Sequence, residues 1–340
     1  MQFAVIAGIA SSLAMPLESR AQEKVLNLYS ARHYQTDEAL YSDFTKQTGI
    51  KINRIEAGDE QLLQRLKAEG TNSPADVLLL VDAARLWRAQ ADGLFQPVDS
   101  KVLNERIPAQ LRSSDGTWYG FSTRARAIVY NKANVKPEDV DTYEELADPK
   151  NKGKVCTRSG SHPYMLSLMG SRIDTMGEAG AEQWAKGVVT NMARPPSGGD
   201  TDQIKAVAAG ECGAAVTNTY YWVRLLRSTD PKDQEIVSKV GFVWPNQAGS
   251  GAHVNISGGG VAKNSPNRAH AIAFLEYLSS ASAQNYFANG NNEFPVSKGV
   301  TSNNAALSSL GKFKQEDVAI SSIAKNTVVA QRILDRVGYK

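Results

Sequence analysis

Apolar, strand-like stretches alternate with amphipathic, helix-like stretches over the first hundred residues. Strands are predicted at 24–31, 50–57 and 75–82, and helices at 36–49 and 59–70. Thr36 and Gly49 are typical residues for the start and the end of the first helix. The continuous Val and Leu run of the third strand is typical of a strand buried on both faces. Strands and helices that alternate at this spacing predict parallel βαβ units.

The pattern changes near Asp115, where a turn-forming Asp115-Gly116 pair precedes a long β-forming stretch that ends near 132. We expect this stretch to cross as extended chain from one lobe to another. A second α/β set follows, with strands at 153–159 and 212–218, helices at 164–173, 181–192, 202–210 and 220–228, a return crossing at 240–265, and an amphipathic helix at 267–290. The chain is therefore predicted to be an α/β protein of two lobes with a hinge of extended crossings. We expect 22–121 and 252–300 in the first lobe, and 122–251 and 301–340 in the second.

The N-terminus has the pattern of an export signal. Residues 3–15 form an apolar run of signal-peptide length, and Ala21 offers a small residue before a polar start. We expect 1–21 to be a cleavable signal peptide, although no basic residue precedes the run; a buried N-terminal strand or helix is the alternative. No later segment approaches the roughly 18 uninterrupted apolar residues of a transmembrane helix. The mature protein is expected to be soluble and periplasmic.

Composition and charge narrow the class further. The hydrophobic share of 42% and charged share of 21% are those of a soluble globular protein. The net charge of +3 comes from 38 basic and 35 acidic residues that are scattered along the chain, so no basic block indicates nucleic acid or lipid headgroups. Cys156 and Cys212 lie in short strand-like stretches, and in an exported protein they could form a disulfide. Two buried free thiols are the alternative.

Aromatic side chains follow three of the predicted strands, at the point where each strand gives way to a helix. His33 and Tyr34 follow the first strand, Tyr164 follows 153–159, and Tyr220 and Tyr221 follow 212–218. Ligands of open parallel sheets bind at the carboxyl ends of strands, which in a two-lobed protein face the crevice between the lobes. The coincidence of three such places is stronger evidence for a site than any one motif.

Phenol side chains in such a crevice fit a hard metal ion. A phenol has a pKa of about 10, so a phenolate at neutral pH needs the help of a multivalent cation, and helix N-termini add to this. Anionic oxygen ligands match Fe³⁺, and His33 could add an imidazole nitrogen. Four phenolates around Fe³⁺ leave one surplus negative charge, which Arg124, Arg126 or Arg224 could balance.

Packing, structural roles and salt bridges are the alternative interpretations of these residues. A Tyr-Tyr pair taken alone is more often packing than a metal site. We interpret His162, His253 and His270 as structural or solvent-facing. The glycine-rich stretch 257–262 is predicted to be a hinge or a close-packed crossing rather than an anion cradle. The arginines of "STRAR" could form salt bridges between the lobes.

In the segments "SARHYQTDE", "SGSHPY" and "TNTYYWVRLL" the chain resembles the periplasmic ferric iron-binding proteins of bacterial iron ABC transporters, particularly the cyanobacterial Fut type related to the Fbp bacterial transferrins. The resemblance covers essentially the whole mature chain. It implies a type II, transferrin-like binding fold, with ferric iron held by His33, Tyr34, Tyr164, Tyr220 and Tyr221. It also implies that Arg124 offsets phenolate charge, and that the iron is passed to an inner-membrane ABC permease. We expect the protein to be a monomer. Acid, or reduction to Fe²⁺, would weaken the coordination and release the metal.

Two other functions are the alternatives to iron capture. One is a binder of an organic solute, such as a polyamine, a sugar or a thiamine-like cation, but such sites use acidic clusters or stacking platforms. The other is an iron-dependent redox enzyme or a hydrolase. The sequence contains no GxSxG, HExxH or nucleotide-binding fingerprint, so we expect no enzymatic activity.

Overall fold

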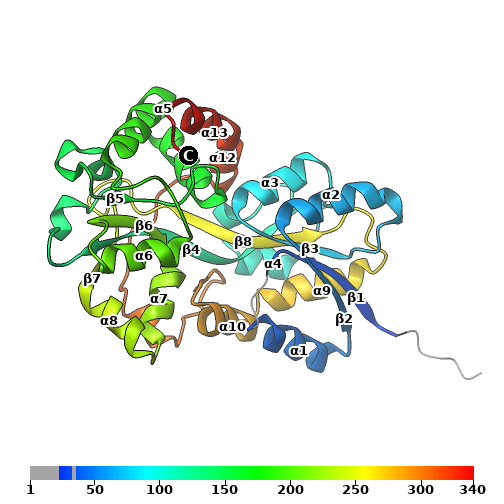
Figure 1. Ribbon diagram of the computed structural model, residues 1–340. Coiled ribbons are helices and arrows are strands. Elements are labelled where there is room, and N and C mark those ends of the chain that lie inside the picture. The colour runs from blue at the N-terminus through cyan, green and yellow to red at the C-terminus, as the bar shows by residue number, and fades with distance from the viewer. Residues whose placement is uncertain (1–22, 33–35) are drawn as a thin grey trace, which may run out of the picture.

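A mixed sheet runs through the molecule and is shared by two lobes (Figure 1). The computed structural model describes residues 23–32 and 36–340. The strand order is β2-β1-β3-β8-β4-β6-β5, with β7 and β9 also paired to β4. The strands are β1 (Val25–Ser30), β2 (Lys51–Glu56), β3 (Val77–Val81), β4 (Tyr119–Asn131), β5 (Val155–Cys156), β6 (Ala214–Asn218), β7 (Val240–Val243), β8 (Val254–Val261) and β9 (Phe294–Pro295). Strand β1 is parallel to β2 and β3, and β5 is parallel to β6, as the βαβ patterns predicted.

Helices cover both faces of this sheet (Figure 1). They are α1 (Asp37–Thr48), α2 (Asp59–Glu69), α3 (Ala83–Ala91), α4 (Lys101–Arg106), α5 (Pro163–Asn191), α6 (Asp200–Ala208), α7 (Thr219–Arg227), α8 (Pro231–Lys239), α9 (Arg268–Leu278), α10 (Ala281–Asn291), α11 (Ala305–Ser308), α12 (Ile320–Lys325) and α13 (Thr327–Arg336). Of these, α1, α2, α6 and α7 begin and end within two residues of the predicted places. Short 3-10 turns lie at Gly70–Asn72, Ala109–Leu111, Pro137–Asp139, Glu144–Ala147 and Pro149–Asn151. Among the described residues, no helix is both long and apolar enough to cross a membrane.

Three local predictions need correction. The amphipathic stretch 267–290 is two helices, because α9 ends at Leu278 and Ser280 caps α10 by accepting a hydrogen bond from the amide of Ala283. The predicted strand at 153–159 shortens to Val155–Cys156. Thr36 lies at the start of α1 without capping it, since its hydroxyl donates to Asn291 instead. Gly49 ends α1 with φ 70°, as predicted.

Two antiparallel strands, β4 and β8, carry the chain between the lobes, so the predicted two-lobed α/β fold with extended crossings is confirmed (Figure 1). The first half of β4 pairs with β8, and the second half, from Arg126 onward, pairs with β6 and β7. The glycines of β8 allow neighbouring backbone to approach closely. A Cβ on Gly260 would lie 2.1 Å from the carbonyl oxygen of Thr117. The glycine-rich stretch is therefore a close-packed crossing, as predicted.

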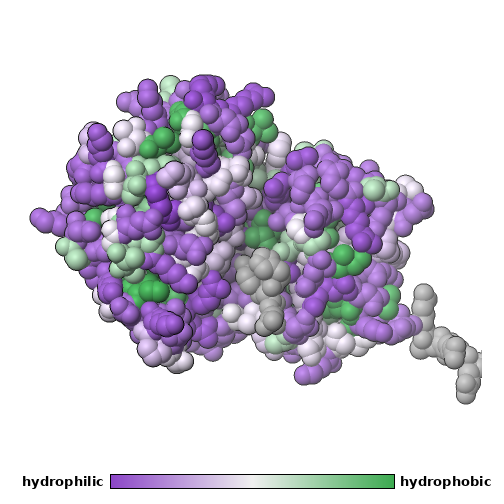
Figure 2. Space-filling model, in the orientation of Figure 1, coloured by the Kyte–Doolittle hydropathy of each residue, from purple (hydrophilic) through white to green (hydrophobic). Residues whose placement is uncertain are grey.

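Separate apolar clusters form the core on either side of the crossings. On one side α1 and α9 pack Phe44 against Phe274, with ring centroids 5.0 Å apart. On the other side α5 packs Trp184 beside Tyr143, and its indole donates to the Tyr143 carbonyl at 2.7 Å. Figure 2 shows that the visible face of both lobes is mostly hydrophilic, with apolar residues only in small groups.

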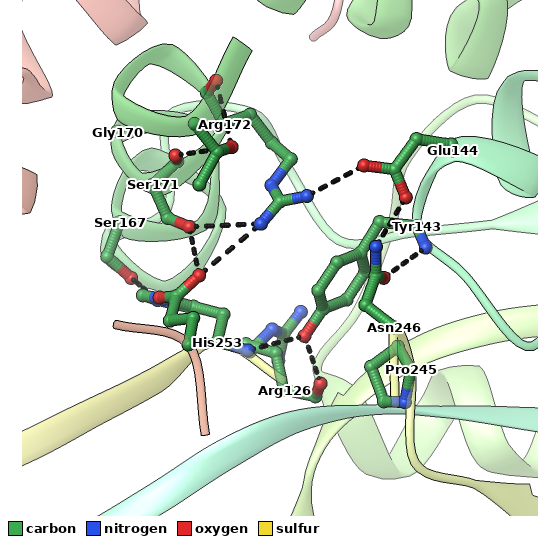
Figure 3. Close-up of polar contacts among 12 residues, drawn as sticks. Arg126, Tyr143, Glu144, Ser167, Gly170, Ser171, Arg172, Pro245, Asn246 and His253 are labelled. Carbon is green, nitrogen blue, oxygen red and sulfur yellow. Dashed lines mark hydrogen bonds and ion pairs between the residues drawn. The ribbon is translucent and has the colours of Figure 1, made fainter. Parts of the chain in front are cut away.

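A buried network of hydrogen bonds connects β4 to the residue that precedes β8 (Figure 3). The hydroxyl of Tyr143 donates to the carbonyl of Arg126 in β4 and accepts from the amide of His253, just before β8. The ring of His253 is fully buried and contacts Glu316 and the hydroxyl of Ser167. His253 is therefore a structural residue, as the sequence interpretation expected.

Candidate metal site

Tyrosines from two helix N-termini converge between the lobes. Tyr164 is the second residue of α5, and Tyr220 and Tyr221 are the second and third residues of α7. The hydroxyls of Tyr164 and Tyr220 lie 2.9 Å apart, and the ring centroids of Tyr220 and Tyr221 lie 4.3 Å apart. The structure thus brings together three of the predicted ligands. The other two, His33 and Tyr34, lie outside the described residues.

The three phenols line a cleft of about 560 Å³ that has walls from both lobes. Its other lining residues are Thr36, Arg158, His162, Arg224, Gly290, Asn291 and Asn292. A neighbouring hollow of about 450 Å³ shares Tyr164 and His162 with it and also contains Glu56 and Asp59. A larger hollow, of about 620 Å³, lies away from the tyrosines at Trp87 and Trp118 and has no carboxylate or phenol in its lining. The chemistry therefore points to the cleft between the lobes.

Guanidinium groups lie against the faces of the tyrosine rings. The guanidinium carbon of Arg158 lies 4.9 Å from the centroid of Tyr164, and that of Arg126 lies 5.8 Å from the same centroid. Arg224 lies 5.1 Å from the ring centroid of Tyr221. A cation over an aromatic face is attracted by the ring, and it also favours negative charge on the phenol oxygen. Two of the three predicted arginines therefore lie beside the phenols.

The third predicted arginine, Arg124, lies in a buried ionic cluster in β4. Its side chain is 1% exposed, donates to the hydroxyl of Ser257 at 2.9 Å and lies 3.9 Å from the carboxylate of Glu293. Glu293 is also paired with Arg32 at 3.2 Å, next to the end of β1. Arg32 is paired in turn with Asp37 at 2.8 Å, so the two guanidiniums and the two carboxylates of this cluster balance one another.

His162 has a larger part in the site than the sequence interpretation gave it. Its Nδ1 accepts from the amide of Tyr164 and so caps α5, and its ring centroid lies 4.4 Å from that of Tyr164. Burial lowers the pKa of His162 to about 3, and the charges of Arg158 and Arg126 act in the same direction. The imidazole is therefore neutral near pH 7. His270, in contrast, donates from Nδ1 to the carbonyl oxygen of Val25 at 2.7 Å in the first lobe, away from the cleft.

Two further residues of the site were not found by sequence reasoning. Arg158 follows Cys156 by two positions, and Asp200 is the first residue of α6. The carboxylate of Asp200 binds Arg126 at 2.6 Å and Arg158 at 3.1 Å. The only signal in the sequence is an acidic residue at a helix start, which does not reveal a partner 42 positions away.

The donor set has the chemistry of a phenolate site. Within the described residues no group of three or more His, Cys, Asp and Glu side chains could hold a metal ion. The converging donors are instead phenol oxygens, which are hard ligands once deprotonated and suit a small, highly charged cation. Both tyrosine-bearing segments start helices, whose free N–H groups and dipoles favour negative charge there.

The two cysteines form a disulfide that ties this lobe together. Cys156 ends β5 and Cys212 precedes β6, and their Cα atoms lie 5.8 Å apart. The bond thus joins the two strands that lead into the tyrosine-bearing helices.

Two lobes around a cleft, joined by extended crossings, define a solute-binding protein. The sequence profile of the family described as bacterial extracellular solute-binding protein matches residues 39–315, and the chain belongs to this family. Within it, the chain is 50% identical to iron uptake protein A1 of Synechocystis sp., over 95% of this chain and 89% of that protein. It is 27% identical to the major ferric iron-binding protein of Neisseria meningitidis, over 93% of each chain.

A solved structure supports the same relationship. The Trichodesmium protein IdiA (FutA), in complex with iron and citrate, matches with a TM-score of 0.89 and 53% identity, over 93% of this chain and all of that one. The resemblance to the Fut type and to the Fbp proteins is thereby confirmed, and so is the type II binding fold. These relatives are binding proteins, so an enzyme is not the expected class, and the organic-solute alternative is not favoured.

Proposed function

We propose that the protein captures ferric iron in the cleft between its lobes and delivers it to an ABC permease in the inner membrane. The observation that carries the proposal is the convergence of Tyr164, Tyr220 and Tyr221 from two helix N-termini, with guanidiniums against their rings. The iron-binding names of relatives that cover nearly the whole chain support it.

The full ligand set in this proposal is His33, Tyr34, Tyr164, Tyr220 and Tyr221. Four phenolates around Fe³⁺ leave one surplus negative charge, and a buried site needs that charge offset. In this proposal Arg124, Arg126 and Arg224 offset it: Arg126 and Arg224 lie over phenol rings, whereas Arg124 is buried in β4, 3.9 Å from Glu293. The match of oxygen ligands to a hard cation favours Fe³⁺ over Fe²⁺, so reduction or acid releases the metal.

The proposal extends to the organisation of the chain in the cell. Residues 1–21 act as a cleavable signal peptide, and the mature protein works in the periplasm as a monomer without enzymatic activity. The first lobe comprises 22–121 and 252–300, and the second comprises 122–251 and 301–340. The separate apolar clusters on the two sides of the crossings support this division, although Ile320 and Ile323 of α12 pack with the first-lobe cluster.

The direct test is visible absorption of the ferric-loaded mature protein. Wild-type protein is expected to show an intense phenolate-to-iron charge-transfer band. The double variant Tyr164→Phe, Tyr221→Phe should lose or shift the band, whereas Tyr286→Phe, on α10 and outside the cleft lining, should keep it. A colourless wild-type protein that binds no iron would refute the proposal. Calorimetry with polyamines, sugars and thiamine would then test the organic-solute alternative.

A further inference from the structure

A single buried carboxylate holds the two guanidiniums that face Tyr164. Asp200 is fully buried, and its two carboxylate oxygens bind different partners. Oδ2 binds Arg126 at 2.6 Å and accepts from the amide of Asn218 at 2.7 Å, while Oδ1 binds Arg158 at 3.1 Å. Asn218 is the residue before α7, so the same carboxylate also fixes the start of the helix that bears Tyr220.

The two guanidiniums differ in how firmly the rest of the protein holds them. Arg126 is 2% exposed, and Asn218 and the carbonyl of Val216 also accept from it. Its backbone is fixed as well, because Tyr143 donates to its carbonyl and its amide donates to the carbonyl of His253 (Figure 3). Removing Asp200 therefore leaves Arg126 in place.

Arg158 depends on Asp200 much more. Its side chain is 13% exposed and lines the cleft, so solvent is directly available to it. Asp200 supplies its ion pair within the described residues, and the ring of Tyr164 supplies the surface it lies on. Without the carboxylate, a charged side chain at the edge of a cleft turns toward water, where its hydration is complete.

We propose that Asp200 is a positioning residue of the iron site, which holds the Arg158 guanidinium against the Tyr164 ring. Together, one carboxylate and two guanidiniums give a net charge of +1 beside the phenols. That charge opposes the surplus negative charge of four phenolates around Fe³⁺. This inference rests on the proposed function, because it assigns a role only in the iron-loaded site.

The wavelength of the charge-transfer band distinguishes a positioning role of Asp200 from the electrostatic effect of its charge alone. In this transition an electron leaves the phenolate for the metal, so a cation near the phenolate raises the transition energy and its loss moves the band to longer wavelength. Arg158→Gln should therefore shift the band to longer wavelength. Loss of a negative charge alone acts in the opposite direction. Asp200→Asn should nevertheless shift the band to longer wavelength too, because Arg158 leaves the ring.

The matched control and the double variant complete the test. Asp202→Asn changes an exposed carboxylate on the same helix, which accepts from the amide of Gly199, and the band of this variant should match the wild type. In the Arg158→Gln background, Asp200→Asn should no longer move the band to longer wavelength, since two residues that act as a unit are not additive.

The outcomes distinguish this inference from the function on which it rests. Wild-type protein without any band refutes the proposed function. If the wild type shows the band and Arg158→Gln shows it at the same wavelength, the positioning role is wrong but iron capture still holds. The same conclusion follows if the band of Asp200→Asn lies at shorter wavelength than that of the wild type. Should Asp200→Asn fail to fold because Arg126 loses its buried partner, Arg158→Gln keeps that pair and still decides whether the stacked cation acts on the phenolate.

Discussion

Removing the Cys156–Cys212 disulfide should lower the free energy of unfolding by an amount that follows from the length of the loop it closes. Replacing Cys156 and Cys212 with alanine opens a loop that spans 56 residues. In the chain-entropy description, a cross-link that closes a loop of 56 residues stabilises the folded protein by about 4 kcal/mol. The two half-cystines are 0% and 1% exposed, so the smaller alanines also leave small cavities, which add to the loss.

The measurement is urea unfolding of the oxidised wild type, the reduced wild type and the double alanine variant. The reduced protein keeps the two sulfur atoms, so it isolates the cross-link from the cavities. We expect the free energy of unfolding to fall by about 4 kcal/mol on reduction, and slightly further in the variant. A loss on reduction below about 1 kcal/mol would show that the loop is already constrained in the unfolded chain, and the loop-entropy reasoning would be wrong.

Two further predictions concern the crossings. Burial raises the pKa of Asp82, next to β8, to about 6. The pKa of this carboxyl in the unfolded state is about 3.9, so the folded state keeps the proton up to a higher pH. The stability gained in this way is complete below about pH 4, and up to about 3 kcal/mol is lost as the pH rises past 6. Asp82→Asn should remove that part of the pH dependence in unfolding measurements, and an unchanged profile would contradict the assignment. Gly260→Ala places a Cβ against the Thr117 carbonyl and should destabilise the protein by about 1–3 kcal/mol, whereas Gly249→Ala, whose Cβ would meet nothing closer than 3.9 Å, should stay within about 0.5 kcal/mol. Equal effects of the two glycine variants on the thermal midpoint would argue against close packing at β8.

The sequence predicted the parts of this structure that local patterning controls. The alternation of strands and helices predicted β1, β2 and β3 as parallel strands, and the β-forming run after Asp115 indicated the crossing strand β4. The placement of Tyr164 and Tyr220 followed from the same reasoning, since residues after parallel strands meet at one edge of the sheet. At Ser280, a capping hydrogen bond starts a second helix where one long helix was predicted. The apolar periodicity could not reveal this hydrogen bond.

The parts that could not be predicted depend on contacts between distant positions. Asp200 is 42 residues from Arg158 and 74 from Arg126, and no local pattern pairs them. In the sequence interpretation His162 is structural or solvent-facing. It caps α5, but its place beside the cleft depends on how α5 lies against the first lobe. Arg124 and Arg126 are two positions apart on one strand, yet Arg124 lies beside Glu293 and Arg126 pairs with Asp200.

The strand order also sets when each part of the chain can fold. In the sheet, β8 lies between β3 and β4, so β3 has no hydrogen-bonded neighbour on that side until 254–261 have been made. A first lobe whose sheet is completed by a strand nearly 180 positions later folds through long-range pairing, which is slow. Most of the chain therefore emerges before either wall of the cleft is complete. The candidate metal site therefore assembles late, after the strand that completes the first-lobe sheet has been made.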